Sequence, residues 1–251
     1  MENKLNFDQH FLKNTAFFEV IKQSAKLGVE DVVLEIGPGE GILTRELAKC
    51  VKNVIAVEVD ERFKDALKKL PANVEILYNN ILDILPSLTF NKIIANIPFS
   101  ISEPLFKKLM RSKFSNAVLF TGKKFHTRLT TEKSKLATIS GIFFDIKKIA
   151  EVPRSSFEPA PRVDVVLLLI ERRKKELTKT ERRIKEFLLR DDKKVKNAMI
   201  YALWRVDNKT KRRAREQIAK LPMMSETLEK NVDALSNAEG ANIFKVLENI
   251  R

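Results

Sequence analysis

Short β-branched runs alternate with amphipathic stretches along the first 170 residues, and this alternation constrains the fold more than any other feature. The expected strands are Val32–Ile36, Val54–Val57, Val74–Leu77, Ile93–Ala95 and Ala117–Phe120. Between them lie amphipathic segments such as Ile42–Lys49 and Glu61–Leu70. Strand and helix in this rhythm predict a doubly wound α/β fold with a buried, parallel sheet.

Two further β-rich runs are expected to complete the sheet. They are Lys147–Val152 and Val163–Ile170, and the proline-rich connection VPRSSFEPAPR joins them. Because the two runs are close in sequence, they can pair in antiparallel fashion at one edge. We therefore expect a Rossmann-like sheet of seven strands in residues 1–170.

After Ile170 the pattern changes to helical spacing alone. Thr178 and Glu181 form a capping box before one helix, Val195–Val206 is predicted as a second helix, and Ser236 begins a second capping box. The sequence thus predicts two domains, the sheet domain in 1–170 and a small, all-helical, basic domain in 171–251.

The excess positive charge is concentrated in this helical part. The formal net charge of the chain is +14 at pH 7, and residues 172–215 hold 18 basic against 6 acidic side chains. Clustered cations gain from binding phosphates, so contact with a nucleic acid is expected here, with solvated helix faces as the alternative. For Trp204, helical spacing with Met199 and Leu203 favours packing over stacking on a base.

Composition excludes several classes of protein. The single cysteine, Cys50, rules out an internal disulfide framework and a multi-cysteine zinc site, and two histidines argue against a His-rich metal centre. The longest apolar run, Val165–Ile170, is six residues long, whereas a bilayer span needs ~20. The N-terminus lacks the apolar stretch of a signal peptide. We expect a cytoplasmic monomer without a metal or a membrane partner.

A glycine-rich turn, Glu35-Ile-Gly-Pro-Gly-Glu-Gly41, follows the first predicted strand. Such a turn lets a ligand approach the backbone. The next strand ends at Glu58, whose carboxylate can accept hydrogen bonds from both ribose hydroxyls of a nucleoside. The pair predicts a nucleoside cofactor, either NAD or S-adenosylmethionine (SAM), although the G-x-G-x-G spacing with Pro38 disfavours NAD. A plain strand–helix turn remains the alternative.

Polar residues follow the third and fourth predicted strands as well. Asn80 and Ile81 come where an adenine ring would lie, although Asn79-Asn80 is equally good turn chemistry. Asn96-Ile-Pro-Phe99 closes the fourth strand, and it suits the attack of an exocyclic amine of a base. The Asn96 carboxamide oxygen and the Ile97 carbonyl can accept the two amine N–H bonds, and Pro98 fixes the backbone. Phe99 can stack on the base, whereas the alternative is an Asn-Pro loop with a core Phe.

Taken together, these motifs resemble the KsgA/Erm family of SAM-dependent rRNA adenine N6-dimethyltransferases. The resemblance covers roughly residues 5–170, and its most specific part is the F-x-P-x-P-x-V-D stretch. The matching residues are Asp8-Gln9-His10-Phe11-Leu12, Glu35-Ile-Gly-Pro-Gly39, Glu58, Asn96-Ile-Pro-Phe99 and Phe157-Glu-Pro-Ala-Pro-Arg-Val-Asp164. The family's fold is the seven-stranded class I SAM-dependent methyltransferase sheet.

The resemblance implies a set of site residues. Catalytic roles fall on the Asn96–Phe99 tetrapeptide and on Phe157, which would close on the target base. The implied cofactor-binding residues are Gln9, His10, Leu12, Gly37, Gly39, Glu58, Val59, Asn80, Ile81 and Asn96. The basic residues expected to contact RNA are Arg128, Arg162, Lys193, Lys194, Lys196, Arg212 and Arg213.

The implied function is N6,N6-dimethylation of two adjacent adenines in the 3′-terminal hairpin of small-subunit rRNA, which assists ribosome biogenesis. The stretch 190–201 resembles the small-subunit enzymes, archaeal ones in particular. An Erm-type enzyme acting on large-subunit (23S) rRNA is one alternative.

The chain departs from the family pattern at three places. His10 replaces an Asn, Asn80 replaces an Asp, and Gly122-Lys123-Lys124 replaces Gln-Lys-Glu. These departures leave open a second alternative, a low-activity family member that binds RNA or an assembly intermediate.

Overall fold

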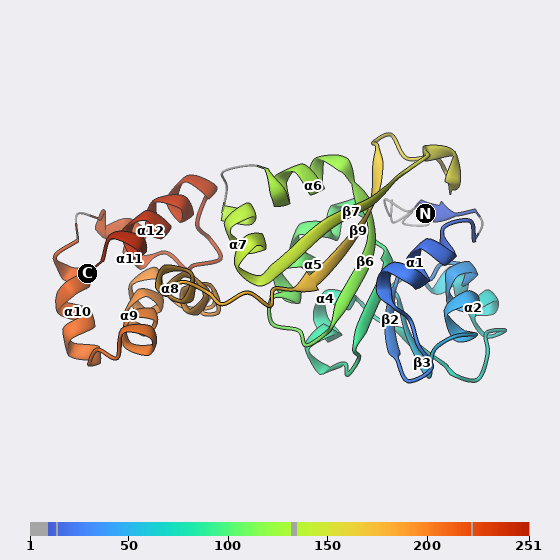
Figure 1. Cartoon of the computed structure of the whole chain (residues 1–251), viewed down its shortest axis with the longest axis horizontal. Coiled ribbons are helices and arrows are strands. Elements are labelled where there is room, and N and C mark those ends of the chain that lie inside the picture. The colour runs from blue at the N-terminus through green and yellow to red at the C-terminus, as the bar shows by residue number, and fades with distance from the viewer. Residues whose placement is uncertain (1–9, 14, 132–134, 222, 251) are drawn as a thin grey trace, which may run out of the picture. The chain divides into compact units, whose positions relative to one another are not determined.

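The computed structural model describes residues 10–13, 15–131, 135–221 and 223–250, and these residues form two compact units (Figure 1). Unit 1 comprises the described residues up to Thr127 together with Asp145–Arg172. Unit 2 comprises Arg128–Phe144 and the described residues from Arg173 onward. The segment 128–144, which the predicted division at residue 170 assigns to the first domain, thus belongs with the helices of unit 2.

Unit 1 is built on a seven-stranded sheet with the strand order β4-β3-β2-β5-β6-β9-β7. Four neighbouring pairs, from β4 through to β6, are parallel, and β9 is antiparallel to β6. The strands are β2 (Val32–Ile36), β3 (Asn53–Glu58), β4 (Val74–Tyr78), β5 (Lys92–Asn96), β6 (Asn116–Gly122), β7 (Phe144–Val152) and β9 (Val165–Arg172).

All seven predicted strands are present, and the sequence analysis was correct that a seven-stranded α/β sheet forms. The first expected strand matches β2 residue for residue, and the ends of the others differ by at most three residues. The last strand in the sequence, β9, inserts between β6 and β7. Counted along the chain, the sheet order is 3-2-1-4-5-7-6.

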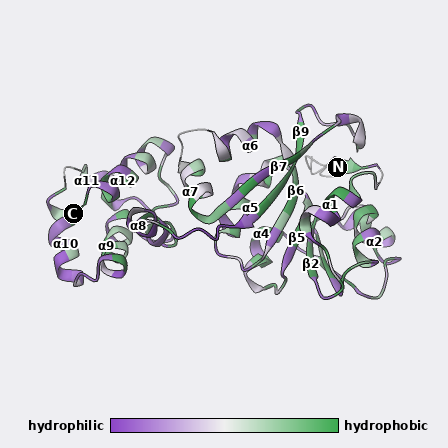
Figure 2. Cartoon of the chain, viewed as in Figure 1, coloured by the Kyte–Doolittle hydropathy of each residue, from purple (hydrophilic) through white to green (hydrophobic). Residues whose placement is uncertain are grey.

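Both faces of the sheet are buried, which explains the nearly continuous apolar runs. Val33, Val54, Ile94 and Val118 point to the face that α1 and α2 cover, and they share one core with Leu47. The residues next to them along each strand, which point to the other face of the sheet, are also buried. Figure 2 shows β6 as predominantly hydrophobic, whereas the edge strand β7 carries a hydrophilic stretch.

Short helices and 3-10 turns connect the strands of unit 1. The α-helices are α1 (Phe18–Ala25), α2 (Ile42–Ala48), α3 (Lys64–Leu67), α4 (Ile81–Ile84) and α5 (Ser102–Leu109), and α6 (Lys123–Thr130) begins there. The 3-10 helices are η1 (Glu61–Phe63), η2 (Leu85–Ser87), η3 (Phe99–Ile101) and η4 (Arg154–Ser156). The predicted helix over 61–70 is therefore η1 followed by the short α3.

A separate two-stranded sheet joins the N-terminal segment to the proline-rich connection. Strand β1 (Phe11–Leu12) pairs antiparallel with β8 (Phe157–Glu158), with Leu12 opposite Phe157. The Lys13 amide extends this pairing by donating to the Ser156 carbonyl at 2.9 Å. The motifs at the two ends of unit 1 thus form one structural element, although some 145 residues separate them along the printed sequence.

Unit 2 is helical, as the sequence predicts for 171–251. Its helices are α7 (Lys135–Phe143), α8 (Lys179–Leu188), α9 (Val195–Asp207), α10 (Lys211–Ala219), α11 (Ser225–Glu229) and α12 (Asn237–Asn249). Both predicted capping boxes, at Thr178 and Ser236, are formed. Helix α9 packs on α8 and α10, and the buried Arg183 guanidinium pairs with Asp207 at 2.7 Å.

Among the described residues, the structure contains no helix with the length and apolar character that a membrane span requires. The same residues include no group of three or more His, Cys, Asp or Glu side chains arranged to hold a metal ion.

Candidate functional site

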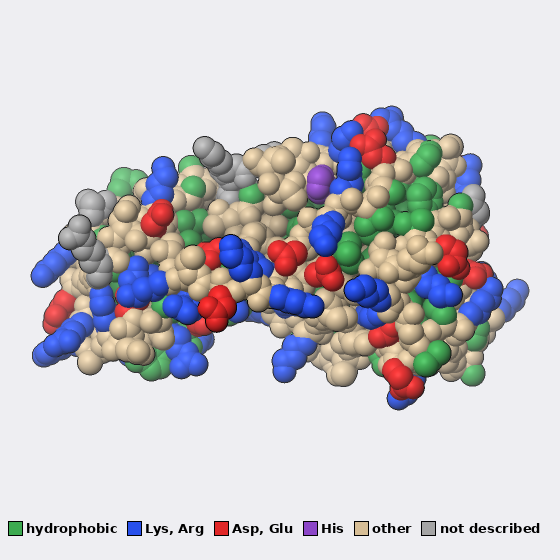
Figure 3. Space-filling view, in the orientation of Figure 1, with side chains coloured by type: hydrophobic (Ala, Val, Ile, Leu, Met, Phe, Trp, Pro, Cys, Tyr) green, Lys and Arg blue, Asp and Glu red, His purple; other side chains and the backbone are tan. Residues whose placement is uncertain are grey.

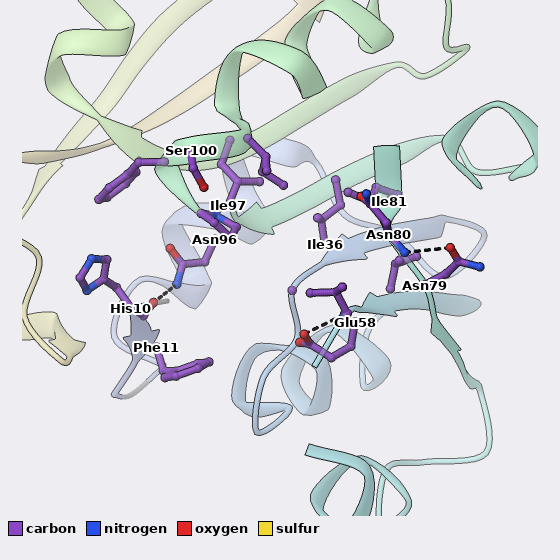
Figure 4. A pocket seen from close by; sticks show the side chains of 16 residues that line it. His10, Phe11, Ile36, Glu58, Asn79, Asn80, Ile81, Asn96, Ile97 and Ser100 are labelled. Carbon is purple, nitrogen blue, oxygen red and sulfur yellow. Dashed lines mark hydrogen bonds between the residues drawn. The ribbon is translucent and has the colours of Figure 1, made fainter. Parts of the chain in front are cut away.

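A pocket of about 260 Å³ opens at the carboxyl ends of β2, β3, β4 and β5 (Figure 4). Ligands bind at this edge in open α/β sheets because the loops that follow parallel strands converge there. The pocket is lined by His10, Phe11, Ile36, Gly37, Val57, Glu58, Val59, Asn79, Asn80, Ile81, Asn96, Ile97, Pro98, Phe99, Ser100 and Ile101.

The glycine turn and Glu58 are joined by hydrogen bonds. Gly37 and Gly39 have φ of +71° and +56°, in the left-handed region that favours glycine. The Gly39 amide donates to Oε2 of Glu58 at 3.0 Å, and the Val59 and Asp60 amides donate to Oε1 at 2.9 Å. Burial raises the pKa of Glu58, and the three amide donors oppose that rise. The fold thus holds a buried carboxylate at the end of β3.

A second carboxyl group, that of Glu35, lies in the same turn region. Burial raises the pKa of Glu35 to about 8, and the nearby charge of Glu58 acts in the same direction. Oε2 of Glu35 is buried without a hydrogen-bond partner. Burial therefore favours the neutral acid form of Glu35, whereas both oxygens of Glu58 accept amide hydrogens, as a carboxylate does.

Asn96 ends β5 with a fixed amide orientation. Its Nδ2 donates to the backbone carbonyl of His10 at 2.5 Å (Figure 4). A carbonyl only accepts hydrogen bonds, so the nitrogen of the Asn96 amide must face it. The Oδ1 atom therefore remains available as an acceptor in the pocket.

The residues around Asn96 form the rest of this end of the pocket. Ile97 is buried, whereas Phe99 is half-buried at the start of η3. The rings of His10 and Phe99 lie 5.7 Å apart and are tilted by 33°. Nδ1 of His10 lies 2.8 Å from the Pro159 carbonyl, which links β1 to the proline-rich connection. Asn96 and the aromatic side chain of Phe99 thus line the same pocket.

The end of β4 uses its asparagine side chains on the backbone. Oδ1 of Asn80 caps α4 by accepting from the Leu82 amide at 3.0 Å, and Oδ1 of Asn79 accepts from the Asn80 amide at 2.8 Å. The sequence left open whether these asparagines form a turn or line a cofactor site. In the structure they do both, because they bond the turn backbone and also line the pocket. Ile81 contributes a buried apolar wall beside them.

Three of the expected catalytic and cofactor-binding residues do not line the pocket, and a fourth lies outside the described residues. Phe157 is 1% exposed and packs edge-on against Phe120 in the core, with ring centres 5.8 Å apart. Leu12 is buried in the same core. Gly39 does not line the pocket and acts through its bond to Glu58. Gln9 lies outside the described residues.

Phe11 is the most informative lining residue that the sequence analysis did not assign. A Cβ atom built on Gly39 would lie 2.7 Å from the Phe11 ring, so this glycine also makes room for Phe11. Successive side chains in a strand point to opposite faces. That alternation would have predicted that Phe11 and Leu12 cannot both face the same cavity. Nothing in the motif pattern pointed to Ser100 or Ile101.

The basic residues predicted to contact RNA differ in their pairing. Figure 3 shows Lys and Arg side chains over the surface of α9 and α10. Lys193, Lys194 and Arg212 pair with Asp192, Glu229 and Glu216. Within the described part of the chain, the exposed side chains of Lys196, Arg213 and Arg162 make no ion pair. Arg128 is half-buried and has other interactions.

The 3-2-1-4-5-7-6 sheet, with a pocket at its carboxyl edge, is the sheet of class I methyltransferases. The profile of the family described as ribosomal RNA adenine dimethylase matches residues 1–248. The chain belongs to this family of methyl-transferring enzymes. The KsgA/Erm resemblance inferred from the motifs is therefore confirmed.

Similar curated proteins come from archaea. The chain is 34% identical over 223 residues to a probable ribosomal RNA small subunit methyltransferase A of Methanococcus maripaludis, covering 85% of this chain and 81% of the relative. It is 39% identical over 172 residues to a protein of the same name from Methanosarcina barkeri, covering 64% and 59%.

Solved structures agree on the fold. A dimethyladenosine transferase from Plasmodium falciparum superposes with a TM-score of 0.62 at 27% identity, covering 95% of this chain and 96% of that one. The 23S rRNA methyltransferase ErmE gives a TM-score of 0.60 at 22% identity, covering 95% and 100%. Both comparisons extend beyond the sheet into the helical unit.

Proposed function

We propose that the protein transfers methyl groups from SAM to N6 of two adjacent adenines in the 3′-terminal hairpin of small-subunit rRNA. The observation that carries this proposal is the Asn96 amide. Its nitrogen is committed to the His10 carbonyl, and its oxygen is left to accept a hydrogen bond in a pocket with an aromatic wall. An exocyclic amine on a flat, stackable base is the kind of group that this arrangement suits.

The residues present fit SAM. The Glu58 carboxylate accepts three amide hydrogen bonds and still has acceptor capacity for ribose hydroxyls. Apolar side chains at Ile36, Val57 and Ile81 suit a purine ring. The backbone of Gly37 lines the pocket without a side chain, which leaves room for the amino-acid part of SAM. SAM supplies an electrophilic methyl group when it is bound.

The chain's own residues would prepare the amine for attack. Oδ1 of Asn96 and the Ile97 carbonyl accept its two N–H bonds, which withdraws the nitrogen lone pair from the ring. As the N–C bond forms, these oxygens stabilise the positive charge that develops on nitrogen. Phe99 stacks on the base, which must leave its own stack to reach the pocket. The proton of the methylated amine then passes to solvent, and S-adenosylhomocysteine is left as the second product. The monomethylated amine keeps a single N–H, so only one of the two oxygens would accept a hydrogen bond from it in the second transfer, for which a fresh SAM would be needed.

The small subunit is favoured as substrate because the archaeal relatives are named as small-subunit enzymes and cover most of this chain. An Erm-type reaction on 23S rRNA shares the fold alone. A binding-only member is the other alternative, since Asn80 lacks the family's carboxylate and spends its oxygen on capping α4. The cytoplasm, where ribosomal subunits are assembled, is the compartment this function implies.

The test is methyl transfer to isolated particles. The protein is incubated with labelled SAM and unmethylated 30S or 50S particles, after SAM binding has been measured by calorimetry. Label on 30S particles supports the proposal, whereas label on 50S particles alone supports the Erm-type reaction. If SAM binds and neither particle is labelled, the enzyme proposal is overturned in favour of the binding-only member.

A further inference from the structure

A row of stacked cations and aromatic rings crosses three elements of unit 2. Arg190 lies two residues after the end of α8, Tyr201 and Trp204 lie on α9, and Lys211 begins α10. The Arg190 guanidinium lies 3.9 Å from the centre of the Tyr201 ring, and Nζ of Lys211 lies 4.8 Å from the Trp204 ring. The two rings meet edge to face at 5.4 Å. We call these four residues the aromatic row.

The aromatic row lies on the outer side of α9, away from the core. Met199 and Leu203 on the same helix are fully buried, whereas Trp204 is 38% exposed and Tyr201 is half-buried. In the part of the chain that the structure describes, Trp204 is the one aromatic residue among the exposed large hydrophobic side chains. Core packing, which helical spacing favoured for Trp204, therefore does not account for its position.

The two cations of the aromatic row have no carboxylate partner among the described residues. Nearby Lys193, Lys194 and Arg212 are each paired with an acidic side chain, whereas the charged groups of Arg190 and Lys211 lie over the rings and make no ion pair with a described residue. A cation stacked on a ring keeps its charge free for an external anion. The aromatic row thus offers ring faces and edges flanked by two uncompensated positive charges.

The alternation of rings and cations in the aromatic row matches the chemistry of an unpaired RNA strand. Every base has a flat face that can stack on an aromatic side chain, and the phosphates on either side of it are anions. Duplex RNA hides its base faces, so it can satisfy the two cations but not the rings. A protein partner is the less favoured occupant because the surrounding segment 172–215 is strongly basic.

We propose that the aromatic row binds a single-stranded segment of rRNA, with Trp204 stacking on an unpaired base and Arg190 and Lys211 holding the flanking phosphates. The proposal rests on the proposed function, in that it names a docking site for the same RNA. It assigns a base-stacking contact to unit 2, separate from the pocket in unit 1. The contact positions RNA and takes no part in methyl transfer.

Trp204 is the single tryptophan of the chain, so its intrinsic fluorescence reports directly on this site. The full-length protein is titrated with a short single-stranded RNA and with a duplex of the same length. Stacking is expected to quench Trp204 with the single strand and not with the duplex. Single-strand binding without quenching, or no binding of RNA at all, overturns the proposal, and the latter outcome points to a protein partner.

Variants are compared by anisotropy of a labelled single strand. Trp204→Leu is expected to weaken binding by about five-fold or more, whereas Trp204→Tyr keeps a ring for stacking and stays within about two-fold of wild type. Arg190→Gln and Lys211→Gln should each lower the salt dependence of log K by about one. Lys245→Gln, which removes an exposed charge on α12, is the matched control. Binding of Trp204→Leu within two-fold of wild type refutes the proposal.

The test separates this proposal from the proposed function. RNA binding and quenching are measured without SAM, so they do not depend on methyl transfer. Normal labelling of 30S particles without quenching of Trp204 contradicts only the proposal for the aromatic row. Quenching of Trp204 with no labelling of either particle contradicts only the proposed enzyme activity.

Discussion

Replacing Glu58 by glutamine removes one hydrogen bond of the glycine turn while keeping the shape of the side chain. The amide oxygen of the glutamine is expected to take the Oε1 site, because two amides, of Val59 and Asp60, donate there. The amide nitrogen then takes the Oε2 site and faces the Gly39 N–H, which lies 3.0 Å from that site in the wild type. Two donors then face each other in a buried position.

The expected cost follows from the loss of a partner for a buried donor. An unsatisfied buried N–H costs about 1–3 kcal/mol, which corresponds to an increase of about 5- to 150-fold in the opening equilibrium. Hydrogen exchange of the Gly39 amide, followed by NMR, should accelerate by that factor in Glu58→Gln. The affinity for SAM, measured by calorimetry, should fall by about ten-fold or more because a charged acceptor is lost.

The matched control is Glu61→Gln, the same chemical change at an exposed position three residues away. It should leave both the exchange of Gly39 and the affinity for SAM unchanged. Equal exchange rates for the Gly39 amide in wild type and Glu58→Gln would refute the reasoning. An equal loss of SAM affinity in Glu58→Gln and Glu61→Gln would refute it as well.

Three further predictions concern stability, the core and RNA binding. The pKa of Glu35 is raised from 4.5 to about 8 in the folded state, so the wild type should lose stability as the pH rises from 4.5 to 8. In urea denaturation followed by circular dichroism, Glu35→Gln should show a smaller loss over this pH range. Parallel curves of stability against pH for the two proteins would contradict this reasoning. Phe157→Ala should lower stability by about 3–5 kcal/mol because the ring is buried. Phe99→Ala should cost less stability, because that ring is only half-buried, and should lower the labelling of 30S particles. Lys196→Gln should reduce the salt slope of RNA binding by about one, and an unchanged slope removes this unpaired residue from the interface.

Much of unit 1 could be predicted from the sequence because its strands are buried on both faces. Each strand therefore appears as a continuous apolar run, and the residues just after β2, β3, β4 and β5 must meet at one edge. This reasoning located Gly37, Glu58, Asn80 and Asn96, which the structure brings into one pocket. Local hydrogen-bond chemistry was equally predictable at the capping box of Thr178.

Features that depend on contacts between distant segments could not be predicted. The segment 128–144 joins the helices of unit 2 because α7 packs on α8 and α12. No local sequence pattern in this segment indicates that α7 packs on those helices. The pairing of Leu12 with Phe157 places both side chains in the core, although their motifs suggested contact with cofactor and base. Short β strands such as β1 carry no periodic signal, because two residues cannot establish one.

The most direct test of the central claim is to map the methylated adenines on unmethylated 30S particles by mass spectrometry. The account predicts N6,N6-dimethyladenine at two adjacent positions of the 3′-terminal hairpin with the wild-type protein. With Asn96→Ala, which removes the acceptor oxygen of the pocket, it predicts none at nearly unchanged RNA affinity. Methylation at other positions, or full methylation by Asn96→Ala, would contradict the account.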